Sequence, residues 1–587
     1  MNFISKVFSK DYSAERIKPF SDTITHLDYP EVGIHELLKE TVDKFPKLVA
    51  YDYFGKESTF ERFYQKIEHT AKAFKAIGVK KGDRVTISMP NTPEAITAFY
   101  AINMIGATAN MIHPLSSENE VAYYVEISNS KYFLTLDKLK NRVLKATKNL
   151  NVERIIICSV DISMPLVTKT AYNALELIKN RKNPPPIMTE KLDESHVIMW
   201  NEFYDLGYAY DKKDYKIKSD PNDEAVILYS GGTTGKPKGV RLSNMNFNAM
   251  ALQAISRVES AKPGNSVLSL LPIFHGFGLG CCVHTVLLAG VKCYLIPQFK
   301  PEEFVKLIKK SKPNFVVGVP TMFEALINSK EKSKTYLRPV TDVISGGDTL
   351  KSDLRKRINQ YLADHGSKAQ VRVGYGLSES VAVCILCPSH YYKENAIGLP
   401  MPNTEVRIVK PGTTKEVKPN KLGEICVTGP SVMMGYLNEP IETENTLKTH
   451  YDGKIWLHTG DIGYKNRDGI VFFESRLKRM IVTSGYNVYP NYIEQIIASH
   501  PAVEACVVVG VPHPYRKQVP VANVVLHKNH EGSAELTRDL IKYCEKSIAK
   551  YSMPVAFEYI KSVPKTLIGK VNYRKLEEDC AKKHGKV

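Results

Sequence analysis

The segment from Ala225 to Val240 carries the clearest chemical signal in the chain. Its sequence, AVILYSGGTTGKPKGV, runs from a hydrophobic strand directly into a loop rich in glycine, hydroxyl and lysine residues. Such a loop can bind phosphate, because glycines let backbone N–H groups turn inward while hydroxyls and lysines add donors and positive charge. We expect phosphate contacts from Ser230, Gly231, Gly232, Thr233, Thr234, Gly235 and Lys238.

The loop does not match a Walker A loop. Three residues separate Gly231 from the Gly235–Lys236 pair where that motif requires four, and Pro237 stands where the motif has its magnesium-binding hydroxyl. We therefore expect the loop to bind phosphate through contacts that differ from those of a Walker A loop.

This segment resembles the signature loop of the adenylate-forming superfamily, which contains acyl-CoA synthetases, adenylation domains and luciferases. Seven further motifs similar to those of the family follow in the same order: PIFHGFG from Pro272, ISGGD from Ile344, GYGLSES from Gly374, GEICVTGPSVMMGY from Gly423, WLHTGD from Trp456, FFESRLKRMIVTSG from Phe472 and PKTLIGK from Pro564. The part before Ala225 resembles the first subdomain of the family through weaker motifs. The chain as a whole is most similar to bacterial fatty acyl-CoA synthetases.

The resemblance implies a reaction in two steps. A carboxylate attacks the α-phosphate of ATP to give acyl-AMP and pyrophosphate, and the thiol of coenzyme A then displaces AMP. Because the first step brings two anions together, the site must supply positive charge and Mg²⁺. The family pattern makes Lys570 and Thr234 catalytic and makes Glu379 both catalytic and the magnesium ligand, directly or through water.

The same resemblance assigns the nucleotide site. Tyr375 is expected to stack on adenine, and Asp461 to accept the two ribose hydroxyls. Ser378 stands where the family usually has threonine and keeps the hydroxyl. The remaining expected nucleotide contacts are Gly346, Gly347, Asp348, Gly376 and Arg476.

Two positions are expected to serve the second step. Lys478 matches the hinge about which the small domain of the family rotates, and a hinge needs backbone freedom. Gly485 matches the glycine that lets a pantetheine arm pass close to the backbone, although a simple β-turn would also use a glycine there.

The acid substrate is expected to lie against His275, Phe277 and Gly278. In amino-acid-activating relatives an aspartate occupies the position of His275, and histidine supplies no fixed negative charge, so an amino acid is disfavoured. His275 is either a gate or a packed side chain, and the nearby glycines indicate either an alkyl channel or tight helix packing. The resemblance favours a medium- or long-chain fatty acid and CoA. An aryl acid, and a carrier protein as acceptor, are the alternatives.

Alternating helix and strand patterns must position these residues. From Ile34 onward, amphipathic stretches alternate with apolar runs that end in or near Gly, Pro or Asp, which predicts parallel sheets covered by helices, with ligands at the carboxyl ends of the strands. We predict an α/β fold in which residues 1–477 form an AMP-binding domain for ATP and the acyl substrate. That domain has two α/β subdomains and a small β-barrel-like subdomain. Residues 478–587 form a small, mobile α+β domain that carries the catalytic lysine.

The polar, proline-containing stretch between about Ser159 and Pro221 is predicted to be a surface insertion with some helix, or a docking surface, and not a core element. It also resembles the linker of bacterial fatty-acid members of the family.

Composition limits the remaining function classes. The chain has 587 residues, 43% of them hydrophobic and 24% charged, which is typical of a globular protein. The net charge of +18 suits anionic partners, and a membrane- or nucleic-acid-binding protein is the alternative from another class. No nucleic-acid-binding motif is present. Ten cysteines lie mostly in apolar stretches; for Cys384 and Cys387 a strand is favoured over a zinc site. A cytoplasmic protein is expected, with peripheral membrane association and a homodimer left open.

Overall fold

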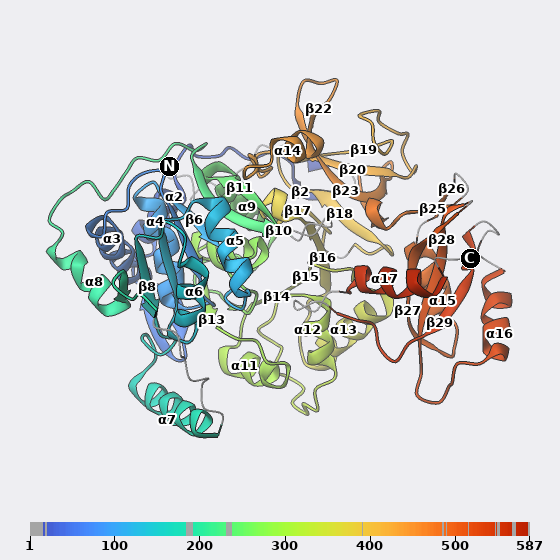
Figure 1. The fold of residues 1–587 in the computed structure, drawn as a ribbon, viewed down its shortest axis with the longest axis horizontal. Helices are drawn as coiled ribbons and strands as arrows, with labels where there is room; N and C mark the ends of the chain where they lie inside the picture. The colour runs from blue at the N-terminus through green and yellow to red at the C-terminus, as the bar shows by residue number, and fades with distance from the viewer. Residues whose placement is uncertain are drawn as a thin grey trace. The chain divides into compact units, whose positions relative to one another are not determined.

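The computed structural model describes residues 16–17, 20–182, 192–230, 237–389, 391–483, 486–488, 490–514, 516–545, 548, 552–565 and 571–584. Two compact units divide the chain. One consists of Met1–Glu405 with Val427–Leu457, and the other of Val406–Cys426 with His458–Val587 (Figure 1). The domain boundary after Leu477 stays a prediction.

The first sheet of the first unit has eight strands in the order β21-β11-β10-β6-β5-β7-β8-β9. Its strands from β10 to β9 pair in parallel, and β11 and β21 are added antiparallel at one edge. Their bounds are β5 Arg84–Ser88, β6 Thr108–Met111, β7 Tyr132–Leu136, β8 Arg154–Cys158, β9 Val197–Met199, β10 Glu224–Ser230, β11 Lys238–Ser243 and β21 Gly435–Tyr436.

The second sheet of this unit runs β18-β17-β16-β15-β14-β12-β13-β3-β4. The central strands from β16 to β3 are parallel, whereas β17, β18 and β4 join as antiparallel hairpin neighbours. Their bounds are β3 Val49–Tyr53, β4 Lys56–Thr59, β12 Ser266–Ser269, β13 Lys292–Leu295, β14 Phe315–Gly318, β15 Asp342–Ser345, β16 Val371–Gly376, β17 Val383–Leu386 and β18 Ala396–Pro400. The predicted parallel sheets are thus confirmed.

Helices alternate with these strands as the sequence pattern predicted. The second sheet is linked by short helices, and a π-helical segment, η2, precedes α10. The bounds are α2 Ile34–Lys44, α3 Phe60–Ala76, α4 Pro93–Met104, α5 Glu118–Ser128, α6 Lys140–Thr147, α7 Leu166–Lys182, α8 Trp200–Ala209, α9 Asn244–Arg257, η2 Phe277–His284, α10 Thr285–Leu288, α11 Phe304–Ser311, α12 Pro320–Ile327 and α13 Ser352–Asp364.

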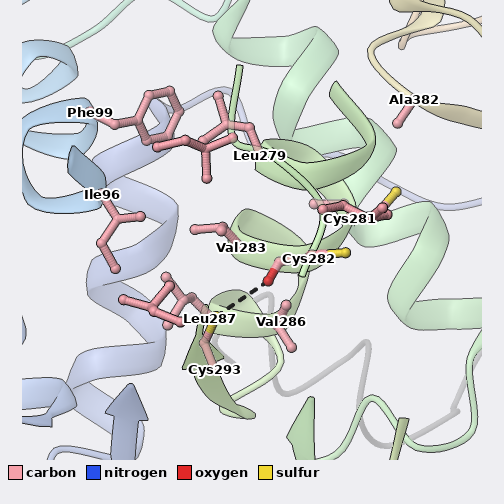
Figure 2. Packing of buried hydrophobic residues seen from close by; sticks show 14 of the residues in the cluster. Ile96, Phe99, Leu279, Cys281, Cys282, Val283, Val286, Leu287, Cys293 and Ala382 are labelled. Atoms are coloured by element: carbon pink, nitrogen blue, oxygen red, sulfur yellow. Dashed lines mark hydrogen bonds between the residues drawn. The ribbon is translucent and has the colours of Figure 1, made fainter. Parts of the chain in front are cut away.

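Helix α4 is buried on every side. It begins where the hydroxyl of Thr92 accepts a hydrogen bond from the backbone N–H of Ala95, at a proline that suits the first helical position. Ile96 and Phe99 of this helix lie beside the η2–α10 segment in the core, where the thiol of Cys293 donates to the carbonyl of Cys282 (Figure 2). The ten cysteines are all buried and unbridged. The predicted apolar strand is confirmed for Cys384, which lies in β17, whereas Cys387 directly follows the last residue of that strand.

A buried hydrogen-bond chain crosses this core through His284. Asn248 donates through Nδ2 to the carbonyl of Val32, so its Oδ1 faces His284 Nε2 at 3.1 Å. Nε2 must therefore carry the proton, and His284 Nδ1 accepts from the hydroxyl of Tyr100 at 3.0 Å. Burial lowers the pKa of His284 to about 3, so the ring is neutral in the folded protein.

Because of His284, we expect the free energy of unfolding to fall at acidic pH. Between about pH 6.5, its ordinary pKa, and about pH 3 the unfolded chain binds a proton that the folded chain does not. The group therefore destabilises the fold as pH falls, by up to ~1.4 kcal/mol per pH unit. Urea unfolding at several pH values in this window should show a flatter slope for His284→Gln. The exposed residue His530 gives the control, since His530→Gln should keep the wild-type slope. Equal slopes for all three proteins would contradict the prediction.

The stretch from Ser159 to Pro221 contains more structure than predicted. Helix α7 lies on the surface as expected, but β9 adds an edge strand to the first sheet and α8 buries Phe203 completely. The prediction that this stretch forms no core element is wrong for α8. Helix α8, WNEFYDLGYA, is rich in apolar and aromatic residues, but it follows the polar, proline-containing segment on which the prediction for the whole stretch rested.

The second unit contains strands β20 Gly423–Thr428, β23 Ile455–Lys465 and β24 Val471–Arg476 for most or all of their length, and the elements that follow them. Its last sheet has the order β26-β25-β28-β27, with β29 parallel to β28. The bounds are β25 Ile481–Thr483, β26 Tyr486–Val488, α15 Pro490–Ala498, β27 Val503–His513, β28 Lys517–Leu526, α16 Ala534–Glu545, β29 Ala556–Tyr559 and α17 Tyr573–His584. This is the α+β composition predicted for the carboxyl-terminal part.

Candidate functional site

The two ends of the glycine-rich loop lie side by side. Ser230 ends β10 and Lys238 begins β11, and the two residues oppose each other in the antiparallel register. The expected contacts at Gly231, Gly232, Thr233, Thr234 and Gly235 lie outside the described residues. The loop thus begins at the carboxyl end of β10, the outermost of the parallel strands in this sheet, which is the end where α/β folds bind their ligands.

A cluster of charged and phenolic groups joins this loop to Glu379. Glu379 lies in the short 3-10 helix η4 (Ser378–Ser380), and its Oε1 accepts a hydrogen bond of 2.8 Å from the hydroxyl of Tyr436 on β21. The ammonium of Lys238 lies 4.9 Å from the centre of the same ring and forms an ion pair with Glu442 of α14 (Pro440–Thr446). Burial, followed by the charge of Glu379, raises the pKa of Tyr436, so its hydroxyl remains a donor.

This arrangement changes what Lys238 can do. Its ammonium already faces the Glu442 carboxylate, so a phosphate on the loop must compete with that carboxylate or share the lysine with it. The structure thus brings Ser230, Lys238 and Glu379 together through Tyr436, a residue that the sequence argument left without a role.

The residues expected around adenine follow adjacent parallel strands. Gly346 and Gly347 come directly after β15, and Tyr375 and Gly376 end the neighbouring strand β16. Gly347 has a φ of +77°, which favours glycine. Asp348, beside them, is exposed, and its carboxylate accepts from the backbone N–H of Thr349.

Phe277 connects this group to the expected acyl site. A Cβ atom on Gly346 would lie 3.1 Å from Phe277 Cζ and 3.1 Å from the carbonyl oxygen of Gly374. The aromatic ring therefore packs against the glycine turn, and the two expected subsites share this side chain.

The space beside Gly276 and Gly278, which follow His275, is filled by the backbone of other segments. A Cβ on Gly276 would lie 1.6 Å from the carbonyl oxygen of Val381, and one on Gly278 would lie 2.0 Å from that of Pro272. Tight packing, one of the two alternatives from the sequence, therefore accounts for these two glycines. A Cβ on Gly376 would likewise lie 1.5 Å from the carbonyl oxygen of Ala382.

Val381 carries backbone strain beside Glu379. It has a φ of +64° and a ψ of −61°, and the N–H of Ala382 donates to the carbonyl of Ser380 across it at 2.7 Å. This is a γ-turn of the rare, positive-φ type at a completely buried β-branched residue. Such strain costs about 1–3 kcal/mol and clusters at functional sites.

His275 is half-buried among aromatic rings. Its ring centre lies 4.8 Å from that of Phe274, which in turn lies 4.3 Å from the ring of His113. Burial lowers the pKa of His113 and favours its neutral form. This neutral, aromatic surrounding does not distinguish a gate from a packed side chain.

In the second unit, Asp461 and Arg476 face each other across β23 and β24. Arg476 Nε lies 3.2 Å from Asp461 Oδ1, and the carboxylate is buried while the guanidinium is exposed. Glu424 organises the turn before Asp461, because its Oε1 accepts from the N–H of Gly460 and its Oε2 lies 3.0 Å from His458 Nδ1. The buried carboxylate of Asp461 thus lies between the organised turn and the exposed cation of Arg476.

The expected hinge lies in the 3-10 helix η5 (Leu477–Arg479). The next residue, Arg479, donates to Asn491 at 2.7 Å and stacks on Tyr573, while Asn491 donates to the carbonyl of Glu474. Residues on both sides of Lys478 therefore contact one another, and rotation about Lys478 would change these contacts. Gly485 and Lys570 lie outside the described residues.

Three residues that position expected site residues, each within its own unit, received no role from the sequence: Glu424, Tyr436 and Glu442. Glu424 and Tyr436 both fall in GEICVTGPSVMMGY, which was matched as a motif without a role for either residue. The residue types could have pointed to them. A buried glutamate needs a partner for its charge, and a buried tyrosine usually needs one for its hydroxyl, so a glutamate in an apolar strand and a tyrosine beside a glycine are candidates for such contacts. Glu442 gave no such signal, because it stands among other acidic residues of a surface helix.

Comparison with known proteins extends these observations to the whole chain. The family model for AMP-binding enzyme matches residues 38–437, and the model for AMP-binding enzyme C-terminal domain matches residues 492–570. A long-chain-fatty-acid–CoA ligase of Bacillus subtilis is 31% identical over 578 residues, which cover 96% of this chain and 98% of that protein. The 4-coumarate–CoA ligase 4 of Arabidopsis thaliana is 29% identical over 547 residues, with 90% and 88% covered.

A solved structure shows the same fold. ATP-bound MatB from Rhodopseudomonas palustris matches with a TM-score of 0.79 at 22% identity, over 93% of this chain and 99% of that one. The ordered motifs, the arrangement around Glu379 and both family matches agree, and this chain belongs to the family of AMP-binding, adenylate-forming enzymes that includes the carboxylic acid–CoA ligases.

Proposed function

We propose that this protein is an AMP-forming fatty acyl-CoA synthetase. It activates a medium- or long-chain fatty acid with ATP, through an acyl-AMP intermediate, and transfers the acyl group to CoA. The observation that carries the proposal is the similarity to the Bacillus subtilis long-chain-fatty-acid–CoA ligase along nearly the full length of both chains.

The residues around Glu379 support the adenylation step. Mg²⁺ prefers hard oxygen ligands, and the half-buried Glu379 carboxylate, which Tyr436 holds through Oε1, has a second oxygen to offer such a cation. When bound, Mg²⁺ would offset the charge of the ATP phosphates. Lys570 would hold the attacking carboxylate against the α-phosphate, Thr234 and its neighbours would bind the phosphates, and Asp461 would accept from the ribose hydroxyls.

The second step would follow a rotation about Lys478 that brings Gly485 to the pantetheine channel. The backbone strain at Val381 lies in the first unit, and in the second unit the exposed guanidinium of Arg476 pairs with the buried carboxylate of Asp461.

An aryl acid is the second candidate substrate. The Arabidopsis 4-coumarate–CoA ligase has nearly the same identity to this chain as the bacterial fatty-acid ligase. The aromatic surface formed by Phe274 and His113 beside His275 would also suit a flat ring.

A pyrophosphate-release screen tests the proposal. Acetate, octanoate, palmitate, benzoate and a coumarate-type acid are each supplied with ATP and Mg²⁺, with and without CoA. We expect the fastest release with octanoate or palmitate, and formation of acyl-CoA when CoA is present. A preference for the aromatic acids would select the second candidate. Absence of release with every acid would contradict both.

A further inference from the structure

Helix α7 exposes an unusual amount of apolar side chain. Five large aliphatic residues on this one helix are more than half exposed: Leu166 (80%), Val167 (82%), Leu175 (67%), Leu177 (64%) and Ile178 (53%). Elsewhere among the described residues, large exposed hydrophobic side chains are scattered. Isolated exposed aliphatics are ordinary, but a cluster on one element indicates an interaction surface.

The opposite face of α7 is fixed to its own unit by polar contacts. Lys138 lies 2.9 Å from the hydroxyl of Tyr172 and pairs with Glu176, while Asp161 accepts from Asn173 at 3.2 Å and lies 3.4 Å from Lys169. These residues are spaced i, i+3, i+4, i+7 and so share one face. The helix is therefore held at a set orientation with a defined outer face.

The outer face has the pattern of an amphipathic helix turned outward. Val167, Ala171, Ala174, Leu175 and Ile178 are spaced i, i+4, i+7, i+8, i+11, form one stripe and are all exposed. In Figure 1, α7 stands apart from the sheets and the other helices of its unit. The side chains that would normally be buried in a core thus point away from it.

The charges on the helix identify the partner. Its sequence has four basic residues, Lys169, Lys179, Arg181 and Lys182, and a single acidic one, Glu176, which Lys138 pairs with. Lys179 and Arg181 are exposed at the carboxyl-terminal end, beside Leu177 and Ile178. Aliphatic side chains flanked by cations are the combination that binds a bilayer interface with anionic lipids. No helix among the described residues is long and apolar enough to cross a membrane.

We propose that α7 is an interfacial helix that docks this enzyme on an anionic phospholipid surface. Val167, Leu175 and Ile178 enter the boundary between headgroups and acyl chains, and Lys179 and Arg181 contact the lipid phosphates. The contacts of Asp161 and Lys138 with α7 connect the docked helix to the rest of the first unit. The proposal does not depend on which acid the enzyme activates.

Vesicle sedimentation of the full chain tests this. Wild type should bind vesicles of equal parts phosphatidylcholine and phosphatidylglycerol, and should bind pure phosphatidylcholine and high-salt samples at least ~10-fold more weakly. The double variant Leu175→Glu/Ile178→Glu and the charge variant Lys179→Glu/Arg181→Glu should each lose at least ~10-fold of the binding. The matched control is Ile441→Glu/Tyr451→Glu, which adds the same charge at residues that are 72% and 76% exposed elsewhere, and it should bind like wild type.

Three results would overturn the proposal. The first is absence of binding by wild type, and the second is equal loss in the control and in the α7 variants. The third is a concentration-dependent dimer of wild type, detected by sedimentation velocity, that Leu175→Glu/Ile178→Glu abolishes without changing vesicle binding, because α7 would then meet a second copy of the chain. Pyrophosphate release from a dissolved fatty acid without vesicles should be the same in all variants, which shows that they fold and separates this test from that of the proposed function.

Discussion

Replacing Glu379 by glutamine should lower acid-dependent pyrophosphate release by about 100-fold or more, equivalent to ~2.7 kcal/mol of transition-state stabilisation. Glutamine has nearly the same shape, and its amide oxygen can still accept from the Tyr436 hydroxyl. The substitution therefore removes one negative charge and a hard ligand while the local packing is kept. The concentration of Mg²⁺ at half-maximal rate should rise together with the loss of rate.

The matched variant is Tyr436→Phe. It removes the hydrogen bond to Glu379 but keeps the carboxylate charge and the ring beside Lys238. We expect a loss of about 10-fold, consistent with one hydrogen bond to a charged group, and a smaller change in the Mg²⁺ titration. If Glu379→Gln kept both the rate and the Mg²⁺ dependence of wild type, the carboxylate would not be a metal ligand.

The alternation of strands and helices and the ends of several strands could be predicted from the sequence, because both depend on local patterns. Ser230, Gly346 and Tyr375 each stand where an apolar run gives way to glycine, and the structure places all three at the ends of β10, β15 and β16 or directly after them. Parallel strands bring their carboxyl ends to one edge, so these positions follow from the predicted fold class without any knowledge of contacts.

Contacts between distant segments could not be predicted. Tyr436 is 57 residues from Glu379, and Glu442 is 204 residues from Lys238. No periodicity links such positions, and their pairing follows from the antiparallel addition of β21 to β11. From the sequence, the charge of Lys238 was expected to serve phosphate binding, whereas in the structure Lys238 pairs with the carboxylate of Glu442.

The glycines near His275 show a second limit. A glycine is required both where a ligand approaches the backbone and where another backbone segment does, and the residue type is the same in both cases. Only the carbonyl oxygens of Val381 and Pro272 beside Gly276 and Gly278 decide for packing. The strained γ-turn at Val381 was equally hidden, because valine is among the residues least expected at positive φ.

Replacing Lys570 by alanine should separate the two half-reactions. Adenylation, measured as acid-dependent exchange of pyrophosphate into ATP, should fall by about 1,000-fold, because the variant removes the cation that we propose to hold the carboxylate against the α-phosphate. Formation of acyl-CoA from supplied acyl-AMP should stay within about 3-fold of wild type, since that step begins after the phosphate bond has broken.

Lys565→Ala is the matched control for this prediction. Lys565 is exposed in the same motif and pairs with Val571, the residue that follows Lys570 in the sequence, so the ends of this segment are held together whichever lysine is changed. The pairing is made by the backbone, and alanine at either position leaves it in place. Lys565→Ala should therefore keep both half-reactions. If Lys570→Ala lost both half-reactions equally, the lysine would support the fold of the second unit. If Lys570→Ala and Lys565→Ala lost adenylation equally, the total positive charge of the segment would matter and not the position of one ammonium group.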